Sequence, residues 1–221
     1  MRRFIYQRAQ GPAEAVQMAA ASVAADSRSR TKVEFIAGGT TLLDLMKLDV
    51  MQPDTIIDIN SLSEAGYGRI ELNQHGLRLG ALVRMADAAD HAGIKSGYPV
   101  VAQSLAQAAS QQLRNMASLG GNVLQRTRCT YFRDVSYREC NKRNPGSGCA
   151  AMSGFNRMHA VLGGSDHCIA TYPGDFAQAL IALEAAGKSQ AAAGTEPSRS
   201  QTCTANRPIR RIKKRICAPA R

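Results

Sequence analysis

The feature that most constrains the fold is a strand, a glycine-pair loop, a helix and a second strand in immediate succession. The β-branched and aromatic run 33–37 predicts a strand that ends at the Gly-Gly-Thr-Thr sequence of residues 38–41. A helical stretch follows at 42–48, and 55–59 has the pattern of the next strand. Glycines placed where a strand turns into a helix leave backbone N–H groups that an anion can approach. A phosphate or diphosphate suits such a loop, and a tight turn that needs positive φ is the structural alternative.

A second glycine pair follows the stretch 100–117, whose apolar residues recur at helical spacing and predict one long amphipathic helix. Residues 117–123 read Ala-Ser-Leu-Gly-Gly-Asn-Val, which places hydrogen-bonding Ser and Asn side chains on either side of the pair. Two such loops in one small domain can hold both ends of an extended diphosphate cofactor, whereas a helix C-cap followed by a turn is the alternative. The first loop lacks the lysine of a P-loop and the third glycine of the dinucleotide fingerprint, so it predicts neither mechanism.

The remaining pattern predicts an α+β chain with a small mixed sheet and no internal repeat. We expect helices at 12–25, 87–91 and 175–183, a short strand at 169–173, and a hairpin with strands at 69–73 and 77–81. Periodicity is lost in residues 126–168, where Arg, Asn, Pro, Gly and aromatic residues crowd together. This segment is the cysteine-rich loop. A connection of such length needs something to organise it.

The charge is distributed unevenly along the chain. The sequence has a formal net charge of +11, of which the nine Lys/Arg and the single acidic residue of the tail 185–221 supply +8. The tail is poor in large apolar residues, so we expect it to be disordered, with a nucleic-acid-binding tail as the alternative. No apolar run approaches the ~18 residues of a membrane helix, and the basic N-terminus has no apolar stretch after it. We therefore expect no membrane span and no export signal of the chain's own.

Four of the six cysteines fall within the cysteine-rich loop: Cys129, Cys140, Cys149 and Cys168. No two have the C-x-x-C spacing of many zinc sites, so spacing leaves an iron–sulfur cluster, a zinc ion and unligated or disulfide-bonded thiols open. A metal centre would cross-link a segment without periodicity, and the seven Lys and Arg residues of the loop would stabilise thiolates. His159 and His167 are interpreted as loop residues rather than ligands.

In their order along the chain, these features resemble the FAD-binding subunit of the xanthine dehydrogenase family of molybdenum hydroxylases, in particular the flavin subunit of the bacterial periplasmic aldehyde oxidoreductases. The resemblance covers residues 1–184 and is carried by the stretches 35–47, 112–129 and 140–151. The last, Cys-Asn-Lys-Arg-Asn-Pro-Gly-Ser-Gly-Cys-Ala-Ala, is similar to the inserted loop that holds an extra [4Fe–4S] cluster in that branch. The implied fold is the two-subdomain FAD-binding fold of the vanillyl-alcohol-oxidase/PCMH type, with the family's C-terminal domain absent.

The resemblance also implies the site residues. By position, the first glycine loop would wrap the FAD diphosphate with Ile36, Ala37, Gly38, Gly39, Thr40, Thr41, Leu42 and Leu43. The second flavin loop would comprise Ser118, Gly121 and Asn122. Asp175 would hydrogen-bond the cofactor after a turn in which Gly174 replaces the family's Ser. The four ligands of the [4Fe–4S] cluster would be Cys129, Cys140, Cys149 and Cys168. No residue is expected to act as a general base or nucleophile.

The organisation of the chain and its partners follow from the same resemblance. Residues 1–60 would form the first FAD-binding subdomain, 61–184 the second with the cysteine-rich loop inserted, and 185–221 an atypical basic tail, which we interpret as an out-of-frame or otherwise aberrant terminus. Electrons from a molybdenum-cofactor large subunit and a [2Fe–2S] small subunit would pass through FAD to an acceptor, without nucleic acid or membrane as partner. The location would be the cytoplasm, or the periplasm after export with a partner. A zinc- or iron–sulfur-stapled binding module and an inactive truncated subunit without flavin are the alternatives.

Overall fold

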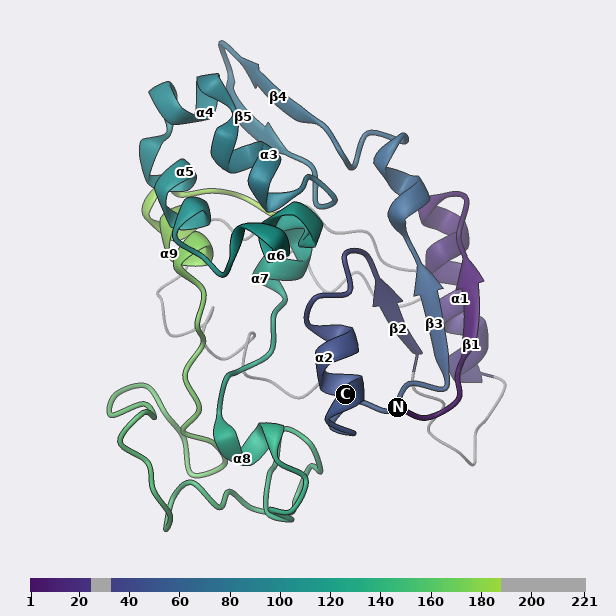
Figure 1. The fold of residues 1–221 in the computed structure, drawn as a ribbon, viewed down its shortest axis with the longest axis vertical. Coiled ribbons are helices and arrows are strands. Elements are labelled where there is room, and N and C mark those ends of the chain that lie inside the picture. The colour runs from purple at the N-terminus through teal and green to yellow at the C-terminus, as the bar shows by residue number, and fades with distance from the viewer. Residues whose placement is uncertain (25–32, 188–221) are drawn as a thin grey trace.

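The computed structural model describes residues 1–24 and 33–187 of the 221-residue chain. Two packed bodies meet in it: an N-terminal sheet covered by helices, and a body of short helices that carries a hairpin (Figure 1). This mixture of helices and strands confirms the predicted α+β class. The subdomain limits 1–60 and 61–184 stay a prediction, and the tail lies outside the described residues from residue 188 onward. Within the described ranges, no helix is long and apolar enough to cross a bilayer.

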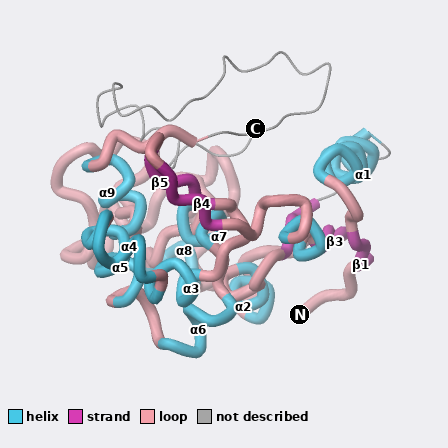
Figure 2. Tube along the Cα trace, turned by 90° about the horizontal axis from the view of Figure 1, so that it is seen from above, coloured by secondary structure: helices cyan, strands magenta, loops and turns pink. Residues whose placement is uncertain are grey.

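The N-terminal body is built on a three-stranded parallel sheet in the order β1-β3-β2. Its strands are β1 (Ile5–Arg8), β2 (Val33–Ile36) and β3 (Thr55–Asp58). Ile57 of the buried central strand packs with residues of α1 (Pro12–Ala24), and Ile56 packs with α2 (Leu42–Lys47). Because successive strand residues face opposite sides, α1 and α2 cover the two faces of the sheet (Figure 2). Cover on both faces is what a parallel sheet requires.

The observed strands differ from the predicted ones in three respects. The predicted mixed sheet is wrong, because β4 (Ile70–Asn73) and β5 (Gly76–Leu79) pair only with each other as an antiparallel hairpin. The sequence does not predict β1, whose four residues are all exposed and show no alternation of apolar and polar side chains. The predicted strand at 169–173 is also wrong, because that segment joins no ladder.

The second body packs its helices around one apolar cluster. The helices are α3 (Met85–Asp90), α4 (Ala92–Gly97), α5 (Pro99–Ala106), α6 (Gln111–Met116), α7 (Leu119–Val123) and α9 (Asp175–Ala182). Ile94, Leu105 and Phe176 are buried together in the cluster. The prediction of one helix over 100–117 is wrong, because the chain breaks between α5 and α6. There Ala109 has a φ of +52°, and Ser110 caps α6 by accepting a hydrogen bond from the Leu113 N–H.

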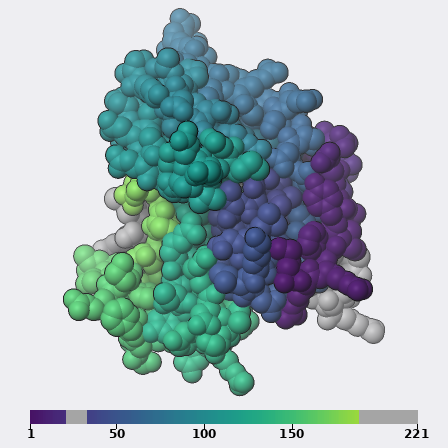
Figure 3. All heavy atoms as spheres, viewed as in Figure 1, coloured from purple at the N-terminus to yellow at the C-terminus, as the bar shows by residue number. Residues whose placement is uncertain are grey.

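The cysteine-rich loop forms a third region that lies beside α2 (Figures 1 and 3). It contains the short helix α8 (Thr130–Arg133) and otherwise follows an irregular course. The Arg143 guanidinium donates to three backbone carbonyls between residues 131 and 137. The Asn141 side chain bonds three backbone groups between residues 146 and 167. Side-chain hydrogen bonds to the backbone thus give the loop the order that its sequence pattern lacks.

Candidate functional site

The first glycine loop lies where the parallel strands end, between β2 and α2. No hydrogen bond among the described residues uses the backbone N–H of Gly38, Gly39, Thr40 or Thr41. These donors are therefore available to an anion. Gly39 has a φ of +70°, so the loop is at once the tight turn and the open set of donors that the sequence left as alternatives.

The hydrophobic residues that flank these donors hold the loop in place. Ile36 is the last residue of β2, and its carbonyl accepts a hydrogen bond from the Ile59 N–H at 3.0 Å. Leu42 opens α2 and is buried with Ile56 in the core. Leu43 is 36% exposed and follows it on the same helix. The backbone of the loop is therefore anchored on both sides, while its central donors stay open.

The second glycine segment lies against the first. A Cβ atom at Gly38 would come within 1.9 Å of the Met116 carbonyl oxygen and 3.2 Å of the Ala117 Cα atom. The two backbones can approach so closely only because residue 38 has no side chain. Segments nearly 80 residues apart in sequence are therefore direct neighbours in the fold.

The local structure of this second segment differs from the prediction. Gly120 and Gly121 do not end a helix or form an open loop, because both lie within α7. Ser118 is 3% exposed and caps α7, its Oγ accepting from the Gly121 N–H at 3.2 Å. The Gly120 N–H donates to the Ala81 carbonyl at 2.8 Å. Because these donors are already used, a ligand would meet side chains here rather than free N–H groups.

Asn122 carries a polar atom that no described residue satisfies. Its Oδ1 is buried and has no hydrogen-bond partner in the described part of the chain. Its Nδ2 lies 3.5 Å from Met85 Sδ. A buried acceptor without a donor costs about 1–3 kcal/mol, and native structures rarely keep one. A bound molecule with a hydroxyl donor would satisfy this oxygen.

Asn60 joins the sheet to the first glycine loop, although the sequence does not single it out. Its Nδ2 donates to the Ala37 carbonyl at 3.0 Å and to Asp58 Oδ1 at 2.7 Å. Asp58 is 3% exposed and also accepts from Tyr6 and Arg8. Burial raises the pKa of this carboxyl, but the hydrogen bonds from its donors outweigh burial and hold the pKa below its ordinary 3.8. The signal that could have found both residues is their place at the carboxyl end of a parallel strand.

Asp175 is exposed in the first turn of α9, which packs against α7. In the described part of the chain, its carboxylate makes no hydrogen bond or ion pair. Tyr172 connects this turn to the second glycine segment, because its hydroxyl donates to the carbonyls of Asn122 at 3.3 Å and Val123 at 2.8 Å. Burial raises the pKa of Tyr172 to about 12, so the hydroxyl keeps the proton that it donates.

None of the four predicted cluster ligands forms a disulfide with another. Cys140 and Cys149 are partners in an antiparallel bridge. Burial chiefly raises the pKa of Cys129, and the nearby thiols of Cys140 and Cys149 raise it further. Three of the four thiols therefore share one neighbourhood, and Cys168 forms a bridge with Ser165 across a tight turn. No group of three or more His, Cys, Asp or Glu side chains in the described ranges is arranged to hold a metal ion.

His159 contacts the first of these thiols. Its Nε2 lies 3.1 Å from Cys129 Sγ, and its Nδ1 is buried without a partner among the described residues. The ring also packs against Tyr131, with centroids 5.9 Å apart. The sequence gives no signal for this contact, since 30 residues separate the histidine from the cysteine.

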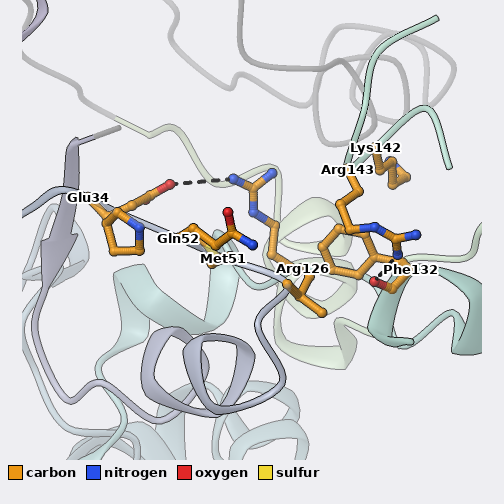
Figure 4. A pocket seen from close by; sticks show the side chains of 9 residues that line it. Glu34, Met51, Gln52, Arg126, Phe132, Lys142 and Arg143 are labelled. Atoms are coloured by element: carbon orange, nitrogen blue, oxygen red, sulfur yellow. Dashed lines mark hydrogen bonds and ion pairs between the residues drawn. The ribbon is translucent and has the colours of Figure 1, made fainter. Parts of the chain in front are cut away.

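A small, half-open hollow lies at the start of β2, away from the glycine loop (Figure 4). It has a volume of about 120 Å³, and its polar lining includes Glu34, Gln52, Arg126 and Lys142. Burial raises the pKa of Glu34, while the Arg126 guanidinium 3.9 Å away opposes the rise. A hollow of this volume holds a few water molecules or a small ion, and is too small for a dinucleotide.

A glycine loop that offers free N–H groups between a parallel strand and a helix, packed against a second glycine segment, is typical of a nucleotide-binding domain that holds an anionic group. The family model described as "FAD binding domain in molybdopterin dehydrogenase" matches residues 2–202, so the chain belongs to this family. The resemblance noted in the sequence and the FAD-binding α+β fold are thereby confirmed.

Curated relatives are consistent with this membership. The aldehyde oxidoreductase FAD-binding subunit PaoB of Escherichia coli is 50% identical over 186 residues, which cover 84% of this chain and 55% of that protein. The glyceraldehyde dehydrogenase medium chain of Sulfolobus acidocaldarius is 38% identical over 88 residues, covering 40% of this chain and 31% of that one. A carbon monoxide dehydrogenase structure from Hydrogenophaga pseudoflava aligns with a TM-score of 0.49 and 27% identity, over 56% of this chain and 40% of that one. The chain thus spans about half the length of PaoB.

FAD is the cofactor of the family's domain, and the residues present fit it. Its diphosphate accepts hydrogen bonds, which the open N–H groups of residues 38–41 can donate. Its sugar hydroxyls donate hydrogen bonds, which the buried Oδ1 of Asn122 can accept. The closeness of the two segments at Gly38 and Met116 lets one extended molecule reach both.

Proposed function

We propose that this chain is the FAD-binding electron-transfer subunit of a molybdenum-dependent aldehyde oxidoreductase. The observation that carries the proposal is the set of open N–H groups at residues 38–41, next to a segment whose Asn122 oxygen lacks a donor. Family membership supports the flavin, and 50% identity to an aldehyde oxidoreductase subunit supports the reaction class. Aldehyde chemistry itself would take place on a partner subunit.

The chain's own residues would bind and orient the cofactor. Residues 38–41 would donate to the diphosphate, while the burial of Leu42 keeps their loop fixed on the core. Asn122 would accept from a sugar hydroxyl, and Ser118 would hold it in place by capping α7. Asp175 would accept a further hydrogen bond from the start of α9. Bound FAD would supply the capacity to accept and release electrons singly or in pairs.

The partners in this proposal are a molybdenum-cofactor large subunit and a [2Fe–2S] small subunit. Similar proteins carry names such as "medium chain" and "FAD-binding subunit", which supports a multi-subunit complex. The complex would reside in the cytoplasm, or in the periplasm if a partner carries the export signal.

A [4Fe–4S] cluster on Cys129, Cys140, Cys149 and Cys168 belongs to the same proposal. Support comes from the lack of a disulfide among the four thiols, from the shared neighbourhood of the first three, and from the loop's seven cationic residues. Cations and backbone donors stabilise thiolates and adjust cluster potentials.

The flavin part is tested by cofactor retention in the full 221-residue chain. The purified protein should absorb at about 450 nm and release FAD on denaturation. Gly38→Ala should lose the flavin, because its methyl group would collide with the Met116 carbonyl. Gly97→Ala is the matched control, since a Cβ there meets nothing within 4 Å. A colourless wild-type protein, or a G38A protein as yellow as G97A, would contradict the proposal.

The cluster part is tested by iron content. Cys140→Ser should lose iron and the broad brown absorbance while FAD stays bound. Val50→Ala is the control, because Val50 packs with Cys140 in the same small core cluster but has no sulfur. Zinc in place of iron in the wild-type protein would favour the zinc-stapled alternative, and unchanged iron in C140S would remove Cys140 from the ligand set.

A further inference from the structure

Arg84 occupies the junction between the helical body and the second glycine segment. It immediately precedes α3, and its backbone forms an antiparallel bridge with Ser118. The guanidinium donates from Nη1 to the Met116 carbonyl, which is the group that Gly38 approaches. Arg84 therefore binds the second glycine segment at the point where this segment contacts the first.

The same guanidinium also reaches the first segment through one intermediate side chain. Its Nη2 donates to Asn60 Oδ1 at 3.2 Å, and Asn60 Nδ2 donates to the Ala37 carbonyl at 3.0 Å. A continuous series of hydrogen bonds therefore runs from Ala37 through Asn60 and Arg84 to Met116. The planar fork of arginine can serve both ends at once, which the single ammonium of a lysine does less well.

Arg84 also carries a charge that no described residue compensates. The side chain is half-buried, and no carboxylate in the described part of the chain pairs with it. The Coulomb energy between charges is larger where water is partly excluded, so an anion bound at the neighbouring glycine loop would be attracted to it.

From these contacts we infer that Arg84 is a positioning residue for the flavin-nucleotide diphosphate, fixing the separation of the two glycine segments and supplying the positive charge behind them. The inference rests on the proposed function, because the diphosphate belongs to FAD. Asn60 is the second positioning residue, and it acts through its hydrogen bonds with Arg84 and the Ala37 carbonyl.

The test is FAD affinity of the full chain, measured by quenching of flavin fluorescence across a range of salt concentrations. Arg84→Met should weaken binding at least about tenfold, the usual effect of losing a charge-assisted hydrogen bond. It should also flatten the decline of affinity with salt, which a purely structural residue would not do. Arg84→Lys should keep the salt dependence while losing part of the affinity. Arg78→Met, in an exposed pair with Glu71 on the hairpin, is the control and should bind like wild type.

Asn60→Ala supplies an independent variant if Arg84→Met lowers the melting temperature of the flavin-free protein too far. It should weaken FAD binding, and the double variant N60A/R84M should lose less than the two single losses combined, because both act in one network. Wild-type affinity in R84M and N60A would overturn the inference and leave the proposed function intact. If the salt dependence of FAD affinity were the same in R84M as in wild type, the positive charge of Arg84 would have no role in binding the diphosphate. A wild-type chain that binds no FAD would overturn both.

Discussion

The two packed bodies and the cysteine-rich loop are held by different interactions. Ile57, Ile94 and Leu105 of the bodies are fully buried, whereas Phe155 and Val161 of the loop are 70% and 96% exposed. The loop instead depends on side chains that bond its own backbone. Apolar burial therefore holds the core of each body, while polar contacts order most of the loop around the small apolar cluster that contains Phe132 and Cys140. The flavin site and the cysteine site should accordingly be separable by mutation.

The largest effect is expected in the helical core. Leu105→Ala should lower the free energy of unfolding by about 2–5 kcal/mol, because it opens a cavity where the side chain is fully buried. Val161→Ala in the loop should change it by no more than about 0.5 kcal/mol. Urea denaturation of both variants measures the difference. Equal losses of unfolding free energy in the two variants would show that the loop is packed like the core, and would contradict the difference between the bodies and the loop.

The loop should open by itself when its polar contacts are removed. Arg143→Met leaves three backbone carbonyls without their donor, at a local cost of about 1–3 kcal/mol. Hydrogen exchange should then accelerate across the loop but not in α5 or β3, and FAD should remain bound. Arg157→Met is the matched control, because Arg157 is exposed and makes no hydrogen bond or ion pair within the described ranges. Faster exchange in α5 as well would show that loop and bodies unfold together.

Acid should destabilise the N-terminal body through Asp58. Its pKa is lowered in the folded state, so the ionised carboxylate stabilises the fold above pH 4, and this contribution disappears as the pH falls through the folded-state pKa. Asp58→Asn should therefore lower the melting temperature at pH 7, by an amount equivalent to about 1–3 kcal/mol, and match wild type in strong acid. A constant difference between the two proteins from pH 7 to pH 2 would contradict this assignment.

The smallest effect is expected at Glu34, where the sheet meets the cysteine-rich loop. Burial raises the pKa of Glu34, so its ionised form opposes folding at neutral pH and its protonated form does not. Glu34→Gln should raise the melting temperature slightly at pH 7 and leave it unchanged at pH 4. A lower melting temperature at pH 7 would show that the ion pair with Arg126 is the stronger influence.

Local patterns were sufficient to predict the unit from β2 to β3, because its β-branched strands and glycine turn are consecutive in sequence. They could not predict the break at Ala109, where no glycine or proline marks the positive φ. Local patterns also could not predict Arg84, whose partners Asn60 and Met116 lie 24 and 32 residues away, and they place Asn60 only at the end of a strand without indicating its contacts. Such contacts depend on how the helices and strands pack together, and this packing produces no periodic pattern in the sequence. The open donors of residues 38–41 were the part of the site best predicted, since they follow from one strand and one loop.

Binding of FAD by the two glycine segments is tested most directly by amide chemical-shift mapping of the isotope-labelled full chain during titration with FAD. We expect the largest changes at the backbone amides of residues 38–41 and at the side-chain amide of Asn122. FAD binding that left those signals unmoved, and shifted residues around the Arg126 hollow instead, would contradict this expectation.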